Sequence, residues 1–188
     1  DAKNFIKKRE VIGTLRYSKK WLSLLDKYNK EKIIKRDNKK NILVLAHTVT
    51  HTSDWKRMIN LLHKLVAKKE FNLSILPHVR GMTNMKPTKE LKKVWDNKSS
   101  LDAAVKKSDI VIFWTTSAIF EAVVRNKKIF YLSFLSKLDG NYIWQKDAPT
   151  NTIIKDEVEL FSEIAKYEIK DLPNNICFQK IIWPEGDP

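Results

Sequence analysis

SDIVIFWTTSAIFEAVVRNKKIFYL, residues Ser108–Leu132, is the stretch that decides the fold. It opens with Asp109–Trp114, a short and almost continuously apolar run that is typical of a parallel strand covered on both faces. A hydroxyl-rich turn at Thr115–Ser117 comes next, and an amphipathic segment then leads to a second apolar run at Ile129–Leu132. The stretch therefore predicts a strand, a turn, a helix and a second strand, which together form a βαβ unit.

The turn of this unit is the first candidate binding site. Thr115, Thr116 and Ser117 carry hydroxyls suited to the start of a helix, where unpaired backbone N–H groups and the helix dipole also attract phosphate. Glu121 follows one turn inside the predicted helix. Its carboxylate would accept hydrogen bonds from a ribose, or it would only favour the helix dipole, and the pattern leaves both interpretations open.

Strands and helices alternate along the rest of the chain. Apolar runs predict further strands at Asn41–His47 and Phe71–Leu76. A first helix is predicted to be capped by Ser18, with Trp21, Leu22, Leu25 and Tyr28 on one face, and a second helix begins at Ser53 or Asp54. Helical turns are predicted at Leu91–Trp95 and Leu101–Lys107. An acidic helix with Val158, Leu160, Phe161 and Ile164 follows near the end of the chain. This order predicts an α/β fold, a doubly wound Rossmann-like parallel sheet with helices on both faces.

Polar residues follow three of the predicted strands. His47 comes directly after the first, and His78 and Arg80 follow the second. Because the carboxyl ends of parallel strands meet at one edge of the sheet, we expect these residues to join the Thr115–Ser117 turn in one anion-binding cleft. In that cleft His47 would act by hydrogen bonding or as a general acid, and Arg80 would hold a phosphate or else pair with a surface carboxylate.

The sequence does not favour a metal site. His47 and His51 are four residues apart, but they lie in a predicted loop, no Glu stands beside either of them, and no third ligand is evident. The chain also lacks the glycine-rich dinucleotide and Walker motifs and the zincin and hydrolase signatures. We therefore expect neither a metal nor another cofactor.

Composition sets the broad class. The chain has 188 residues and a formal charge of +14, and its first 40 residues hold 14 Lys/Arg against 5 Asp/Glu, a net +9. We expect a basic N-terminal helix and linker in residues 1–40 and a Rossmann-like domain in residues 41–188. With a single cysteine, Cys177, and no apolar run near the roughly 18 residues that span a bilayer, a cytoplasmic protein is expected.

Four segments resemble one family, the C-terminal donor-binding domain of GT-B-fold glycosyltransferases and related CDP-glycerol glycerophosphotransferase-like enzymes of bacterial surface polysaccharide synthesis. The segments are VIGTLRYSKKWL at Val11–Leu22, LVLAHTVTH at Leu43–His51, LPHVR at Leu76–Arg80 and DIVIFWTTSAIFEA at Asp109–Ala122. The third departs from the family pattern, because Val79 replaces the usual proline and the expected lysine before His78 is absent.

The resemblance implies one half of a GT-B fold and a transferase whose donor is a nucleotide-diphosphate sugar. Thr116 and Ser117 would hold the donor diphosphate, Glu121 its ribose, and His78 and Arg80 would line the phosphate side, with His47 near the reacting centre. The resemblance also implies that residues 41–188 form a nucleotide-sugar-binding domain that is truncated at its C-terminus. It further implies a separate N-terminal domain for the acceptor, so the isolated chain should turn over little. A CDP-linked polyol-phosphate transferase of the same fold is the alternative.

A basic module without enzymatic activity is the rival hypothesis. The charge of residues 1–40 would attract nucleic acid or an anionic membrane, and such binding would weaken steeply with salt. It would depend on Lys7, Lys8, Arg9, Lys39 and Lys40 and not on Ser117. Within the enzyme hypothesis nucleic acid is not an expected partner, and the same segment would hold the protein at the inner face of the cell membrane.

Overall fold

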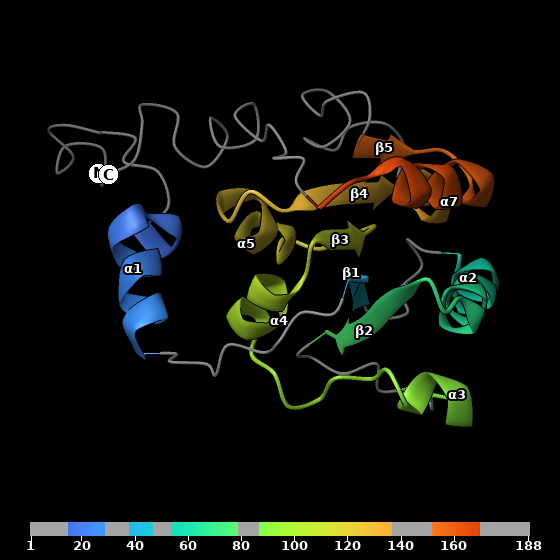
Figure 1. The fold of residues 1–188 in the computed structure, drawn as a ribbon, viewed down its shortest axis with the longest axis horizontal. Coiled ribbons are helices and arrows are strands. Elements are labelled where there is room, and N and C mark those ends of the chain that lie inside the picture. Colours follow the sequence, from blue (N-terminus) through green and yellow to red (C-terminus); the bar gives the residue numbers. More distant parts are fainter. Residues whose placement is uncertain (1–14, 29–37, 47–53, 79–86, 137–151, 170–188) are drawn as a thin grey trace, which may run out of the picture.

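The computed structural model describes residues 15–28, 38–46, 54–78, 87–136 and 152–169 (Figure 1). Its centre is a five-stranded sheet in the order β2-β1-β3-β4-β5, with every neighbouring pair parallel. The strands are β1 (Lys40–Ala46), β2 (Phe71–Pro77), β3 (Ile110–Phe113), β4 (Lys128–Leu132) and β5 (Ile153–Ile154). The predicted α/β fold with a Rossmann-like parallel sheet is therefore confirmed.

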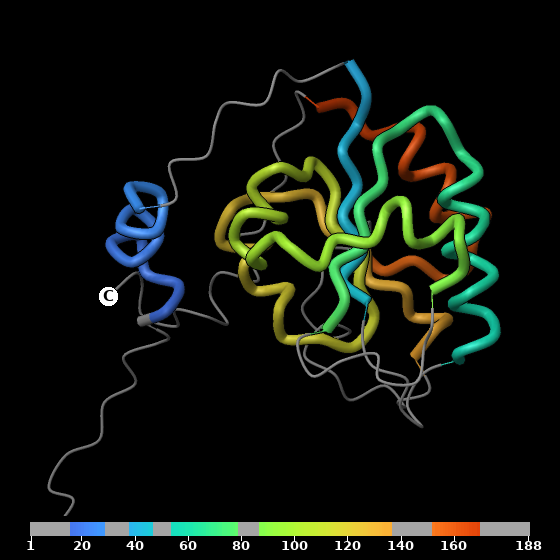
Figure 2. Tube along the Cα trace, turned by 90° about the horizontal axis from the view of Figure 1, so that it is seen from below, coloured from blue at the N-terminus to red at the C-terminus, as the bar shows by residue number. Residues whose placement is uncertain are grey.

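Helices cover both faces of the sheet (Figures 1 and 2). They are α1 (Lys19–Tyr28), α2 (Trp55–Ala67), α3 (Lys89–Lys92), α4 (Leu101–Lys107), α5 (Ile119–Val124) and α7 (Glu157–Lys166), with short 3-10 helices η2 (Leu15–Tyr17) and η3 (Ser133–Leu135). Helices α2 and α7 lie on one face and α4 and α5 on the other, while α1 lies outside α4 and α5. None of the helices in the described ranges has the length and the apolar character that crossing a bilayer requires.

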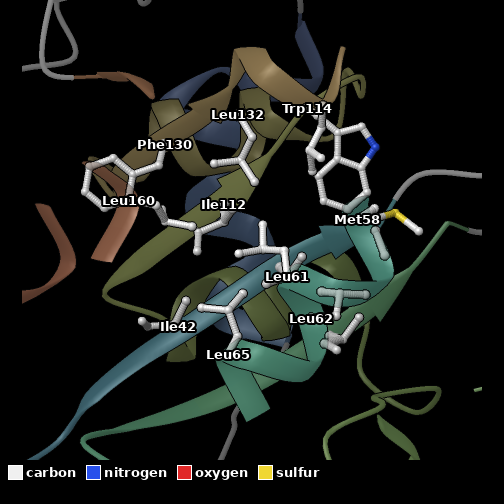
Figure 3. Close-up of a cluster of buried hydrophobic side chains, with 14 of the residues drawn as sticks. Ile42, Met58, Leu61, Leu62, Leu65, Ile112, Trp114, Phe130, Leu132 and Leu160 are labelled. Carbon is white, nitrogen blue, oxygen red and sulfur yellow. The ribbon is translucent and has the colours of Figure 1, made fainter. Parts of the chain in front are cut away.

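The core consists of two apolar layers, one on each face of the sheet. Alternate residues of a strand enter opposite layers, so Ile42 and Val44 pack toward α2 while Leu43 and Leu45 pack toward α4 and α5. Figure 3 shows the layer beneath α2, where Leu61 and other α2 side chains meet the sheet. Because both faces are covered, the central strands are apolar at nearly every position, which is the pattern that identified them in the sequence.

Side-chain caps fix where the helices begin. The Ser18 hydroxyl accepts a hydrogen bond from the backbone N–H of Trp21 at 3.2 Å, and Asp54 accepts one from the N–H of Arg57 at 3.1 Å. Each satisfies one of the donors that a helix start leaves unpaired. The structure confirms the predicted cap at Ser18. Of the two residues predicted as the start of α2, Asp54 is the one that caps it.

Four local features differ from the sequence-based predictions. Leu22 lies with Lys19 and Ser23 on the side of α1 that faces α4 and α5, and not on the predicted face with Trp21 and Tyr28. Helix α3 ends at Lys92, and Trp95 instead forms an isolated bridge with Ile75 at the edge of β2. Strand β5 was not predicted, because two residues are too few to show a period. Val158 does not share the apolar face of α7, since 81% of its surface is exposed.

Candidate ligand-binding site at the carboxyl edge of the sheet

The strand order places a topological switch point between β1 and β3. The chain passes from β1 to β2 on one side and then returns to β3, β4 and β5 on the other. The connections that follow β1 and β3 therefore leave the sheet in opposite directions. In open parallel sheets, ligands bind outside the carboxyl ends of the strands at this reversal point. Residues Trp114–Ser117, directly after β3, are the described residues that lie at this position.

Two buried polar atoms at this edge lack a hydrogen-bond partner. Within the described ranges, the indole Nε1 of Trp114 and the Oγ1 of Thr115 are the buried side-chain nitrogen and oxygen atoms with no partner. Trp114 is 1% exposed and Thr115 is 7% exposed. Buried polar atoms in native structures are nearly always hydrogen-bonded, because leaving one unpaired costs about 1–3 kcal/mol. These two unpaired atoms make the residues after β3 a candidate binding site.

Figure 3 places Trp114 at one end of the core layer beneath α2, beside Met58. The indole nitrogen lies on the side of the ring that faces away from the aliphatic side chains of the layer. Met58 belongs to the first turn of α2. The apolar part of the indole thus lies in the core, and its Nε1 is buried as well.

The Thr115–Ser117 turn does not cap α5 in the predicted way. The residue directly before the helix is Ala118, which has no side-chain cap, and Thr116 Oγ1 accepts a hydrogen bond from the Ala118 N–H at 3.2 Å. Ser117 is exposed at the edge. The hydroxyls of Thr115, Thr116 and Ser117 are therefore in three different environments, and that of Thr115 is the one that is buried without a partner.

His78 lies at the same edge. Its backbone N–H donates to the carbonyl of Ala46, the last residue of β1, at 2.9 Å, so the half-buried His78 stands beside the carboxyl end of that strand. The structure thus brings His78 to the edge where Thr115–Ser117 lie. The other two residues predicted for the cleft, His47 and Arg80, fall outside the described residues.

Glu121 lies in a buried network of charges between α4 and α5. Its carboxylate is paired with the Nε of Arg125 at 3.0 Å, and Arg125 also bonds Asp102 and Asp26. Burial raises the pKa of Glu121, Arg125 opposes this rise through its hydrogen bond and charge, and the charge of Asp102 adds to it. Glu121 is 3% exposed and is paired with Arg125. Its two predicted roles, a contact with a ribose and an interaction with the helix dipole, both stay predictions.

Arg57 is a residue of this edge that sequence reasoning did not single out. It lies in the first turn of α2, exposed, with its guanidinium 4.5 Å from the ring centroid of Phe134 in η3, which follows β4. The N–H of Asp54 donates to the carbonyl of Leu135 at 3.0 Å, so the start of α2 is joined to the end of β4. The sequence did contain a signal for Arg57, because a cation in the first turn of a helix that follows a predicted strand and loop is suited to binding an anion.

The chemistry that this edge supports is the binding of a polar ligand. It offers the indole N–H of Trp114, the hydroxyls of Thr115 and Ser117, and the cation of Arg57. In the parts of the chain that the structure describes, no group of three or more His, Cys, Asp or Glu residues is arranged to hold a metal ion. Neither a scan with models of known protein families nor a search of curated proteins finds a match to this sequence.

Proposed function

We propose that this chain is the donor-nucleotide-binding domain of a GT-B-type glycosyltransferase that acts in bacterial surface polysaccharide synthesis. The observation that supports the proposal most directly is the pair of unpartnered atoms, Trp114 Nε1 and Thr115 Oγ1, beside the switch point of a parallel sheet. The resemblance of Asp109–Ala122 to the diphosphate-binding element of that family supports a nucleotide-diphosphate sugar as the proposed ligand.

On this proposal the catalytic contribution of the domain is electrostatic. Hydrogen-bond donors fixed at the carboxyl edge of the sheet stabilise the charge that develops on the departing nucleoside diphosphate, without a metal. Trp114 donates its N–H to the ligand and Thr115 donates or accepts through its hydroxyl. Arg57 supplies positive charge at the rim. The acceptor site belongs to a second domain, so we expect the 188-residue chain by itself to bind nucleotide and to turn over little.

Titration calorimetry with UDP, CDP and GDP, with and without Mg²⁺, tests the proposal. The informative variant is Thr115→Val, which removes the unpartnered hydroxyl and keeps the shape of the side chain. We expect one nucleotide to bind in preference, independently of Mg²⁺, and its affinity to fall about tenfold in the variant, the usual effect of one hydrogen bond to a charged group. Selectivity for CDP would assign the chain to the CDP-linked polyol-phosphate transferases instead.

Ser108→Ala is the matched control. Ser108 is buried just before β3, at the opposite end of the strand from Thr115, and its hydroxyl donates to the carbonyl of Val105 at 2.8 Å. Nucleotide affinity should be unchanged in this variant. If all three nucleotides bound equally, with strong salt dependence and with no loss in Thr115→Val, charge alone would explain the binding and the donor-site proposal would fail.

We propose in addition that the basic N-terminal segment, residues 1–40, holds the protein at an anionic membrane surface. Its net charge of +9 supports this association, since each Lys or Arg near an anionic bilayer contributes about 1 kcal/mol. Flotation with vesicles of phosphatidylcholine, with and without phosphatidylglycerol, tests it. Binding that is the same with and without the anionic lipid would exclude it.

A further inference from the structure

Helix α1 attaches to the rest of the protein through its polar side. Asp26 forms ion pairs with Lys106 of α4 at 2.5 Å and with Arg125 after α5 at 3.2 Å. Lys19, Leu22 and Ser23 line, with these residues, a surface hollow of about 390 Å³ between α1 and the helices that it faces. Figures 1 and 2 both show α1 as an additional layer outside α4 and α5.

The opposite side of α1 is apolar and faces solvent. Trp21, Leu24, Leu25 and Tyr28 recur at the spacing that forms one stripe on a helix. We call these four residues the α1 stripe. Trp21 is 45% exposed, Leu24 42% and Tyr28 81%, while Leu25 is half-buried. In a surface helix of a globular protein such a stripe normally packs on the core, so the orientation of α1 is the reverse of the usual one.

Positive charge borders the α1 stripe. Lys20 and Lys27 are exposed and lie, at 3.6 residues per turn, next to Leu24 on the helix surface. The helix is part of the segment 1–40, which carries a net charge of +9. Two copies of the chain that met through this stripe would bring like charges together, which opposes association. An anionic surface would complement them.

We propose that α1 is an interfacial membrane helix that inserts the α1 stripe into the surface of an anionic bilayer. Trp and Tyr side chains favour the level of the lipid head groups, Leu24 reaches the acyl boundary, and Lys20 and Lys27 pair with anionic head groups. The ion pairs of Asp26 hold the helix with its apolar side outward, so the orientation exists before binding. This inference rests on the proposed membrane association. It adds that the binding depends on insertion of apolar side chains as well as on charge.

The experiment is flotation of the full chain with vesicles of phosphatidylcholine and phosphatidylglycerol in equal amounts. In Leu24→Ser/Tyr28→Ser the partition coefficient should fall about tenfold or more, because two apolar side chains no longer enter the interface. Val158→Ser is the matched control, since Val158 is also 81% exposed but lies on the acidic helix α7. Its partition should equal that of the wild type. Circular dichroism and thermal unfolding establish that both variants fold.

Tryptophan fluorescence gives a second readout. Emission should shift to the blue when anionic vesicles are added, and the shift should be lost in Trp21→Phe, which still binds. Binding that depends on phosphatidylglycerol but is unchanged in Leu24→Ser/Tyr28→Ser would overturn insertion and leave the charge-based proposal intact. Absence of binding to anionic vesicles would overturn both.

Another occupant of the α1 stripe would also overturn the proposal. A dimer in solution that Leu24→Ser/Tyr28→Ser dissociates would show that a second copy covers the stripe. Nucleotide titration of the same variants keeps the tests separate, because nucleotide binding should be unaffected by changes in α1.

Discussion

The two edges of the sheet differ in how their polar groups are satisfied. At the amino edge, Asp109 accepts hydrogen bonds from the backbone and side-chain N–H groups of Asn41 at 2.8 and 3.1 Å, and Asn41 accepts one from Asn72 at 3.1 Å. Lys127 donates to the carbonyl of Ser108 at 2.7 Å. At the carboxyl edge, buried polar atoms after β3 are left without a partner.

We interpret this difference as one between an edge that serves stability and the edge at which we propose that a ligand binds. Hydrogen bonds at the amino edge connect β1, β2 and β3. They contribute to stability, because each gives a partner to a polar group that would otherwise be buried without one. The unpaired atoms at the carboxyl edge reduce stability in the free protein. Such an arrangement is kept where a ligand completes it. Substitutions at the amino edge should therefore change stability, and those at the carboxyl edge should change ligand binding.

The largest effect is expected from Arg125→Met, next to the amino edge. The substitution leaves the buried carboxylates of Glu121 and Asp102 without their cation, which should lower the free energy of unfolding by about 3–5 kcal/mol at neutral pH. Urea unfolding measures it. If the free energy of unfolding fell by less than about 1 kcal/mol, the network would behave like a surface ion pair that contributes little to stability.

The pH dependence of that loss has a defined sign. Burial raises the pKa of Glu121 above its unfolded value, so its contribution to stability is most favourable below the unfolded pKa and is lost as the pH rises through the folded pKa. Removing Arg125 takes away the interaction that opposes this rise. The deficit of Arg125→Met should therefore shrink as the pH is lowered toward about 4.3, the ordinary pKa of a glutamate.

A smaller effect is expected at the amino edge itself. Asp109→Ala removes both hydrogen bonds to Asn41 and should lower the free energy of unfolding by about 2–3 kcal/mol, since the acceptor is charged and 6% exposed. Chemical denaturation measures this change. Nucleotide affinity of the folded variant should be unchanged, and a coupled loss of affinity would contradict the division between the two edges.

Asn126 should have an effect of about 1 kcal/mol, the cost of placing a side chain other than Gly, Asn or Asp in the left-handed region. Its φ is 51°, and it ends α5 just before the chain enters β4. Asn126→Ala should lower the thermal midpoint, while Asn126→Gly, the control, should leave stability within a few tenths of a kcal/mol because glycine tolerates this φ. Equal losses in both variants would assign the role of Asn126 to its side chain.

The smallest effect on stability is expected from Thr115→Val at the carboxyl edge. Removing a hydroxyl that has no partner should leave the free energy of unfolding unchanged or raise it by less than about 1 kcal/mol. Thermal unfolding with and without nucleotide is the measurement. The variant should match the wild type without ligand and gain less from saturating nucleotide. A clear loss of stability without ligand would mean that the hydroxyl already has a structural partner.

Much of the fold could be predicted because its signals are local. The apolar runs of β1, β2, β3 and β4 and the caps at Ser18 and Asp54 each involve a few neighbouring residues. Strand β5 could not be predicted, since its two residues pair with β4 only once the sheet has formed. The place of His78 at the carboxyl edge follows from strand order, and was predictable from the alternation of elements.

The candidate site was predicted less completely. Thr115–Ser117 were recognised from their hydroxyls, but Trp114 was assigned to the apolar strand, because a sequence does not show whether an indole N–H finds a partner. Glu121 fitted a ribose-binding pattern, yet its closest partner is Arg125, and together they contact Asp102 of α4. Both outcomes depend on contacts between elements and not on spacing along the chain.

Periodicity and capping by themselves determined a parallel α/β sheet, the positions of most of its strands and helices, and an edge rich in hydroxyls after β3. Only the tertiary structure decided which side of α1 faces the protein, because Asp26 and its partner Arg125 are 99 residues apart in the sequence. It also decided that two polar atoms after β3 stay unpaired. Local patterns report what a segment is able to form, whereas burial and pairing depend on which distant segments surround it.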